Sequence, residues 1–473
     1  MRRLFRGVSV GRLCAVTFVS TILVLLAGVA PAFAVPSFAR KYQTSCATCH
    51  YAYPKLNYFG KAFRNNGYRY PEKTDQEMTK EKPVSLGAEG YKKMWPRALW
   101  PADIAGSLPL GMRAILRANE FENDASNSSL EFPHEVELLA AGTIGETFSF
   151  FGEVEIENED NENELEMDFV LQYDPAPSLH VRLGSLSVHP IHDHLRLTAA
   201  HYSAYDTRNT PGSRTVTVDD PNGGSVGVSA STEQDRWRFR DGQPGVELWG
   251  ARNGPGGKGG LTWGTGVVNG QGLNDANDDK DVFARVAYKF GGYGELGGGQ
   301  PPDKPEFWRD DSFKIGGFYY NGTSTNVYEA SALFTDPITP TQITEASGDL
   351  TIENEFDVAG FEFDWWLRDL NLFGLYLRQS DDNPRGTGES IDTDAWFVEA
   401  NYVFYPWLIG VLRYGQTDFD FATSADPEHQ EFLVPAVVFM ARANVKFTAE
   451  AQVRLDDAGK GNDRYILGVD FSF

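Results

Sequence analysis

The chain has 473 residues and is poor in cysteine, in positive charge and in long apolar runs. Its three cysteines are too few for a scaffold built from disulfides. Lys and Arg number 42 against 66 Asp and Glu, and the net charge of −24 argues against nucleic acid, whose phosphates require a basic face. After residue 34 no stretch approaches the ~20 apolar residues of a spanning helix, which excludes a helical membrane protein.

The first 34 residues have the pattern of a secretory signal peptide. A basic start precedes an apolar run over residues 14–30, and a small-residue A-x-A site then ends at Ala34. An N-terminal membrane anchor is the alternative, and the short apolar core argues against it. We expect cleavage after Ala34, which removes Cys14 and leaves Cys46 and Cys49 in an exported protein.

The two remaining cysteines lie in the sequence C-A-T-C-H, which ends at His50. This C-x-x-C-H spacing is typical of c-type haem attachment, in which two thioethers fix the porphyrin and the adjacent histidine ligates the iron. The spacing therefore predicts one haem c, bound covalently through Cys46 and Cys49, with His50 as the proximal axial ligand.

Three other interpretations of the cysteine pair are open. A zinc half-site would need a second cysteine pair, which the chain lacks. A thioredoxin-like redox pair would need a surrounding βαβ pattern, and none is present. A plain disulfide is the third alternative in an exported protein. The adjacent histidine and the lack of any other cysteine favour haem.

The segment after the motif predicts a small helical module. Leu56, Phe59 and Phe63 fall on one face of an amphipathic helix over residues 54–67, and this face is a natural wall for a haem. The rest of the module, which we assign to residues 35–105, is irregular and contains several prolines. Such a module has a small hydrophobic core, so we expect it to pack against a larger domain.

Residues 106–473 alternate between polar and apolar side chains, which is the period of a β-strand. A soluble sandwich also alternates. Three features favour a transmembrane barrel instead: alternating segments of ~9–11 residues with aromatic ends, connections that alternate between short and long, and a last strand that ends on Phe473.

The sequence therefore predicts an all-β fold, an antiparallel transmembrane β-barrel of about sixteen strands with both termini periplasmic. We expect it in the outer membrane of a Gram-negative bacterium, with the α-helical haem module on the periplasmic side or inside the barrel as a lumen plug. Residues 189–243 are expected to form one long loop, and residues 291–311 an unusually long periplasmic connection. The expected strands lie near 108–120, 131–142, 147–157, 164–174, 179–188, 244–252, 260–269, 281–290, 312–321, 355–367, 370–379, 394–404, 408–418, 431–443, 446–456 and 464–473.

A barrel of this size encloses more space than its own side chains fill. The inward set carries both signs, including Arg113, Arg117, Glu135 and Glu137, which indicates a wet lumen that can hold a plug. The long loops are mostly acidic. They either concentrate cations at the outer mouth or form a solvated surface that faces lipopolysaccharide.

The second axial ligand is left open by the sequence. Met94 is the candidate within the haem module, and methionine ligation would raise the potential. His189, His192 and His194 cluster in the long loop, which we expect to fold into the lumen. If neither position supplies a ligand, the iron is five-coordinate.

The stretch from Cys46 to Tyr68 resembles the haem segment of the fused outer-membrane cytochrome–porins of iron-oxidising bacteria. The resemblance lies in C-x-x-C-H followed by Y-P-x-L-N-x-F-G-x-x-F-R-x-x-G-Y, and in the order of signal peptide, one haem site and porin-like barrel. It implies that a haem plug passes electrons between an extracellular donor, typically Fe(II), and a periplasmic cytochrome. Cys46, Cys49 and His50 match the attachment and ligation residues, and no residue of the barrel can be matched.

Three functions follow as hypotheses, and each includes lipid of the outer membrane as a partner. The first is an electron conduit that oxidises an extracellular donor such as Fe(II), with iron(II) oxidase activity left open. The second is a porin for solutes with a structural or sensory haem. The third is the same conduit run outward to reduce extracellular acceptors.

Overall fold

The structure is a computed structural model of the whole chain. Besides short pieces between residues 75 and 104 and the single residues Phe239 and Gly459, it describes residues 37–71, 109–122, 128–159, 162–189, 195–202, 214–230, 242–270, 277–298, 306–335, 343–384, 386–420, 429–456 and 461–472. The signal peptide, Phe473, His192 and His194 lie outside the described residues, so the predictions made for them stay predictions.

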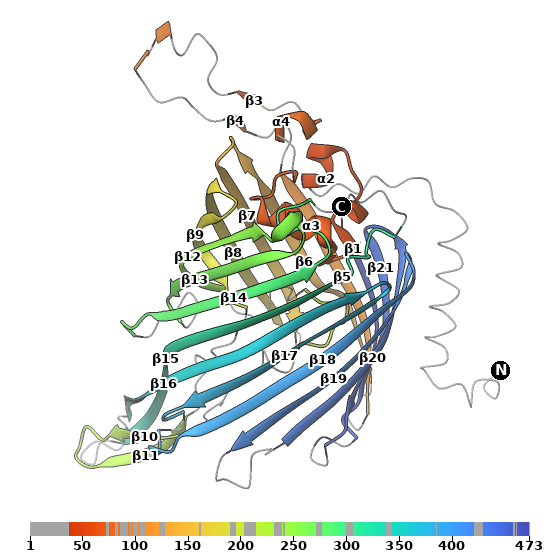
Figure 1. Cartoon of the computed structure of the whole chain (residues 1–473). Helices are drawn as coiled ribbons and strands as arrows, with labels where there is room; N and C mark the ends of the chain where they lie inside the picture. The colour runs from red at the N-terminus through yellow and green to blue at the C-terminus, as the bar shows by residue number, and fades with distance from the viewer. Residues whose placement is uncertain are drawn as a thin grey trace, which may run out of the picture.

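Sixteen antiparallel strands form one closed barrel, in which neighbours along the chain pair with each other (Figure 1). The ring closes between the first and last strands, β5 and β22, and β9 pairs with β12 across the long intervening segment. The strands are β5 (Leu110–Phe121), β6 (Ser128–Ile144), β7 (Phe148–Glu159), β8 (Glu162–Ala176), β9 (Leu179–Ser187), β12 (Gly242–Asn253), β13 (Gly260–Val268), β14 (Asp281–Gly291), β15 (Ser312–Thr335), β16 (Ile343–Leu367), β17 (Leu370–Asp381), β18 (Ile391–Tyr405), β19 (Leu408–Asp420), β20 (His429–Arg442), β21 (Val445–Arg454) and β22 (Arg464–Ser472).

Alternation along each strand separates an apolar outer face from a polar lumen. In β8, Leu165, Met167 and Phe169 are exposed on the outside, whereas Gln172 is buried within the barrel. Outward apolar and inward polar side chains are the pattern of a barrel set in lipid. Within the described ranges, no helix has both the length and the apolar character that crossing a bilayer requires.

All sixteen predicted strands are present, and two expectations about connections are wrong. The segment between β15 and β16 is mostly strand, because pairing continues from Asn321 with Asp357 out to Thr335 with Ile343. Within residues 189–243, a hairpin forms from β10 (Arg214–Asp219) and β11 (Ser225–Ala230). These segments also alternate in sequence, and their apolar sides pack on each other, since Tyr328 and Ile352 of the extensions cluster with Val216 and Ala230 of the hairpin.

The described N-terminal residues form a small, mostly helical unit at one end of the barrel, where β22 also ends (Figure 1). The helix predicted over residues 54–67 is confirmed in its central part as α3. The elements are α2 (Ser37–Tyr42), η1 (Cys46–Thr48), β1 (His50–Ala52), β2 (Lys55–Leu56) and α3 (Tyr58–Asn65), followed by the short α4 (Asp75–Met78), β3 (Val84–Ser85) and β4 (Asp103–Ile104).

Ion pairs join this N-terminal unit to the lumen wall on several sides. Lys61 lies 2.9 Å from Asp364 of β16, and Arg69 lies 2.9 Å from Asp174 of β8. These pairs hold residues 37–71 against inward-facing side chains, as expected of a plug.

The most deeply buried of these contacts is a three-way charge cluster. Lys55 lies 3.9 Å from Glu399 of β18, and Glu399 in turn lies 2.7 Å from Arg413 of β19. All three side chains are buried. The cluster therefore ties the plug to two adjacent strands of the wall.

Two connections also enter the lumen. Residues 195–202 lie inside the barrel, where the Arg413 guanidinium donates to the carbonyls of Ala200 and His201 and the ring of Tyr202 stacks on Phe397 at 4.5 Å. This part of the long loop folds inward, as expected. The long connection after β14 packs against the plug, because the rings of Tyr293 and Tyr58 lie 5.0 Å apart.

Candidate haem-attachment site

The C-x-x-C-H sequence forms a tight turn at the surface of the plug. The η1 turn begins after Ser45, whose hydroxyl accepts from the Ala47 amide at 3.2 Å, and it closes where the Cys49 amide donates to the Cys46 carbonyl at 3.1 Å. Both thiols are free and half-buried. The turn thus presents two thiols and an adjacent imidazole from five consecutive residues.

The two thiols are held in their neutral form. Burial raises the pKa of Cys46, and burial together with the charge of Cys46 raises the pKa of Cys49 to about 12. Either thiol would have to lose this proton before it bound zinc or entered redox chemistry, because the thiolate is the reactive form.

The His50 ring is oriented as a haem ligand needs. Its Nδ1 lies 2.8 Å from the carbonyl oxygen of Pro54. A carbonyl only accepts, so in the neutral ring Nδ1 carries the proton and Nε2 bears the lone pair that can bind a metal. Ligating histidines commonly donate their other N–H in this way. The residues present therefore fit a c-type haem.

Helix α3 is docked on the turn by two residues whose role the sequence does not reveal. Asn57 caps the helix by accepting from the Gly60 amide at 2.9 Å, and its side-chain amide donates to the Thr48 carbonyl at 3.1 Å. A Cβ at Gly60 would lie only 2.1 Å from the Cys49 carbonyl oxygen. Glycine is thus required for this close approach, and N-Y-F-G at residues 57–60 is the one signal of it in the sequence.

The apolar face predicted for the helix is buried. Phe59 and Phe63 are 7% and 6% exposed, and they pack with other aromatic rings of the plug. Phe59 contacts Tyr70 at 5.0 Å, and Phe63 contacts Tyr42 at 5.8 Å. This cluster supports the turn that carries the thiols.

Two of the distal-ligand candidates, Met94 and His189, lie among the described residues. Met94 is 72% exposed, so it would have to become buried to ligate a haem iron. His189 is buried, and its backbone carbonyl accepts from Arg285 of β14 at 3.3 Å. The second axial ligand stays a prediction.

A chain of side chains links His50 to the lumen wall. The rings of His50 and Tyr53 lie 5.2 Å apart, and the Arg113 guanidinium of β5 lies 5.6 Å from the centre of the Tyr53 ring. Arg113 then hydrogen-bonds Glu137 and, at 3.3 Å, Glu135, both on β6. The turn therefore abuts an acidic stretch of the wall.

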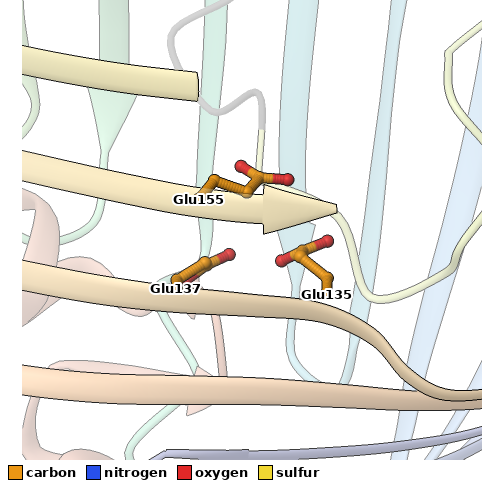
Figure 2. Close-up of side chains that lie close together, drawn as sticks. All are labelled: Glu135, Glu137 and Glu155. Carbon is orange, nitrogen blue, oxygen red and sulfur yellow. The ribbon is translucent and has the colours of Figure 1, made fainter. Parts of the chain in front are cut away.

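That stretch includes a group of three carboxylates, Glu135, Glu137 and Glu155, drawn in Figure 2. One oxygen of each lies within 4.8 Å of the others. Glu137 pairs directly with Glu155 in the ladder between β6 and β7. The alternating glutamates of both strands are visible in the sequence, but their convergence depends on the register, which the sequence does not give.

No protein-family model and no curated protein matches this chain. Solved porins have a similar shape. The anion-selective porin from Comamonas acidovorans is 11% identical with a TM-score of 0.44, over 77% of this chain and 99% of that one. OmpF of Salmonella typhi, in complex with daunomycin, is 13% identical with a TM-score of 0.44, over 77% and 97%. A loop-deletion mutant of OmpT of Vibrio cholerae is 11% identical with a TM-score of 0.42, over 77% and 98%.

Proposed function

We propose that this protein transfers electrons across the outer membrane through one haem c attached to Cys46 and Cys49 and ligated by His50. Its donor is extracellular, with Fe(II) as the candidate, and its acceptor is a periplasmic cytochrome. When bound, the haem supplies a one-electron redox centre. Cys46, Cys49 and His50 would attach this centre to the plug, which lies against the lumen wall of the barrel.

The observation that carries the proposal is the His50 hydrogen bond to Pro54. It sets the imidazole tautomer that a proximal ligand requires, directly beside two neutral thiols. A disulfide would make no use of an oriented histidine. The resemblance to cytochrome–porins, drawn from the same residues, points to the same chemistry.

The porin alternative requires a water path through the lumen. Two segments of this chain occupy the lumen, the plug and residues 195–202, and both are tied to the wall by buried polar contacts. These two segments leave less room for a solute path, whereas an electron can tunnel through packed protein. Their presence in the lumen supports the electron-transfer proposal.

The test is to purify the full chain from bacterial outer membranes and mix it with Fe(II). We expect a Soret band that survives acid–acetone extraction and a haem that Fe(II) reduces. Loss of the Soret band from the protein on extraction would show that the haem is not covalently attached. A covalent haem that Fe(II) leaves oxidised at every pH tested would count against iron as donor, and the same conduit reducing extracellular acceptors would then be favoured.

A further inference from the structure

The lumen wall beyond Arg113 holds more negative charge than its own cations balance. Glu135 and Glu137 share the Arg113 guanidinium with Asp470, which also pairs with Lys446 at 3.0 Å. None of the described residues forms a hydrogen bond or an ion pair with Glu155. One of its carboxylate oxygens nevertheless lies within 4.8 Å of an oxygen of each of the other two, and Figure 2 shows the three side chains close together.

A buried histidine beside the carboxylates provides a second, independent observation. His134 is 4% exposed, and its Nδ1 lies 3.0 Å from Oε2 of Glu131. Among the described residues neither atom has a hydrogen-bond partner, and the two form an ion pair only when the imidazole is protonated. A nitrogen and an oxygen that lie this close without a hydrogen bond are arranged as two ligands of a shared ion would be.

A bulge in β6 places this histidine. The pairing between β5 and β6 jumps from Ile115 with Glu135 to Arg117 with Glu131, so β6 holds extra residues there. As a result, His134 and Glu135 are both buried although they are adjacent in sequence. Bulges of this kind commonly re-aim a side chain at a functional site.

The charges around the bulge do not cancel. The other imidazole nitrogen, Nε2, lies 3.1 Å from Glu157 and also contacts Arg117. The contacts named here join six carboxylates, Glu131, Glu135, Glu137, Glu155, Glu157 and Asp470, to three cationic side chains, Arg113, Arg117 and Lys446. Glu153 also acts electrostatically on Glu155, and Arg464 on Arg117. Partly buried carboxylates repel each other strongly, and a bound cation removes that cost.

We propose that Glu135, Glu137 and Glu155, with His134 and Glu131 beside them, bind a divalent transition-metal cation inside the lumen. Carboxylate oxygens suit Mn²⁺ and an imidazole nitrogen suits Fe²⁺ and Zn²⁺, so the mixed set fits ions of this class. The contacts through Arg113 and Tyr53 place the site next to the His50 turn. Its role as the place where an electron donor binds rests on the proposed function.

Binding can be measured with Mn²⁺, whose six-line electron paramagnetic resonance signal in solution falls when the ion is bound. Purified full-length protein in detergent is titrated with Mn²⁺, and so is a Glu155→Gln variant, which leaves Arg113 with its partners. Glu345→Gln, an exposed position on β16, is the matched control. We expect a saturable site that Glu155→Gln weakens at least about tenfold and that Glu345→Gln leaves unchanged.

His134→Ala provides a second variant that keeps every carboxylate, and we expect it to weaken the site as well. Absence of a saturable site in the unaltered protein would overturn the proposal, and so would a site that neither variant weakens. A chain that binds Mn²⁺ as expected but whose haem Fe(II) does not reduce would overturn the proposed function and leave the site standing. Electron transfer without Mn²⁺ binding would overturn the proposed metal site and leave the proposed function standing.

Discussion

At the residue scale, the chemistry depends on a contiguous motif and on contacts that are far apart in sequence. Cys46, Cys49 and His50 are predicted as haem-binding residues because their spacing sets their relative geometry, and that role stays a prediction. The meeting of Glu135 with Glu155 and that of His134 with Glu131 were not predicted, because the first depends on strand register and the second on a bulge. A contiguous motif fixes the geometry of its own residues, whereas contacts between strands depend on the register, which the sequence does not give.

Replacing both cysteines should abolish covalent haem. In Cys46→Ala/Cys49→Ala no thioether can form, so we expect no haem staining of the polypeptide after denaturing electrophoresis. His50→Gly retains both thiols and should remain stained, with an altered Soret position because the proximal ligand is lost. Staining of the double variant at the level of the unaltered protein would contradict covalent attachment at these residues.

Gly60→Ala should damage the haem site from a distance. The new methyl group would lie 2.1 Å from the Cys49 carbonyl oxygen, so helix α3 must shift away from the turn. Overpacking of this kind costs about 1–3 kcal/mol, and we expect a lower ratio of haem to protein. Gly468→Ala is the control, since the nearest atom to its Cβ is 3.9 Å away. Equal haem content in the two variants would show that the close approach is unimportant.

At the scale of elements, period-two alternation predicted all sixteen strands because each has one face toward lipid. The extensions of β15 and β16 and the β10–β11 hairpin were not predicted, although they alternate as well, because their apolar sides pack on each other. Alternation also does not predict how the plug docks. Lys55 and Glu399 are far apart in the sequence, and nothing in the sequence indicates that they form a pair.

The buried pair of Lys55 and Glu399 gives a test of this docking. Glu399→Gln keeps the shape but leaves Lys55 and Arg413 buried without their carboxylate, which costs about 3–5 kcal/mol. We expect a clearly lower urea midpoint, followed by circular dichroism. The control is Asp392→Asn, whose partner Arg378 is exposed, and it should leave the midpoint nearly unchanged. A similar small effect of both substitutions would mean that the charge cluster does not hold the plug.

At the scale of the whole molecule, the barrel is a frame around its N-terminal unit. The wall supplies lipid contact on the outside and charged partners on the inside, and the plug supplies the thiols and the imidazole. Residues 195–202 add a second body within the lumen. Under the proposed function, passage of electrons and exclusion of solutes are two consequences of this one arrangement.

Single-channel recording tests the exclusion of solutes. We expect the full chain to give little conductance in a planar bilayer and a variant lacking residues 37–71 to give larger steps, because the deletion removes the plug and its ion pairs. Correct insertion of both proteins is checked by the heat-dependent mobility shift of folded barrels. Equal conductance of the two would mean that the lumen is already open.

The most direct measurement places the protein in liposomes that enclose an oxidised redox dye, with Fe(II) added only outside. The account predicts reduction of the enclosed dye by the unaltered protein, and no reduction by Cys46→Ala/Cys49→Ala inserted to the same density. A dye that stays oxidised beside a fully loaded haem, or one reduced equally well in the absence of both cysteines, would contradict it.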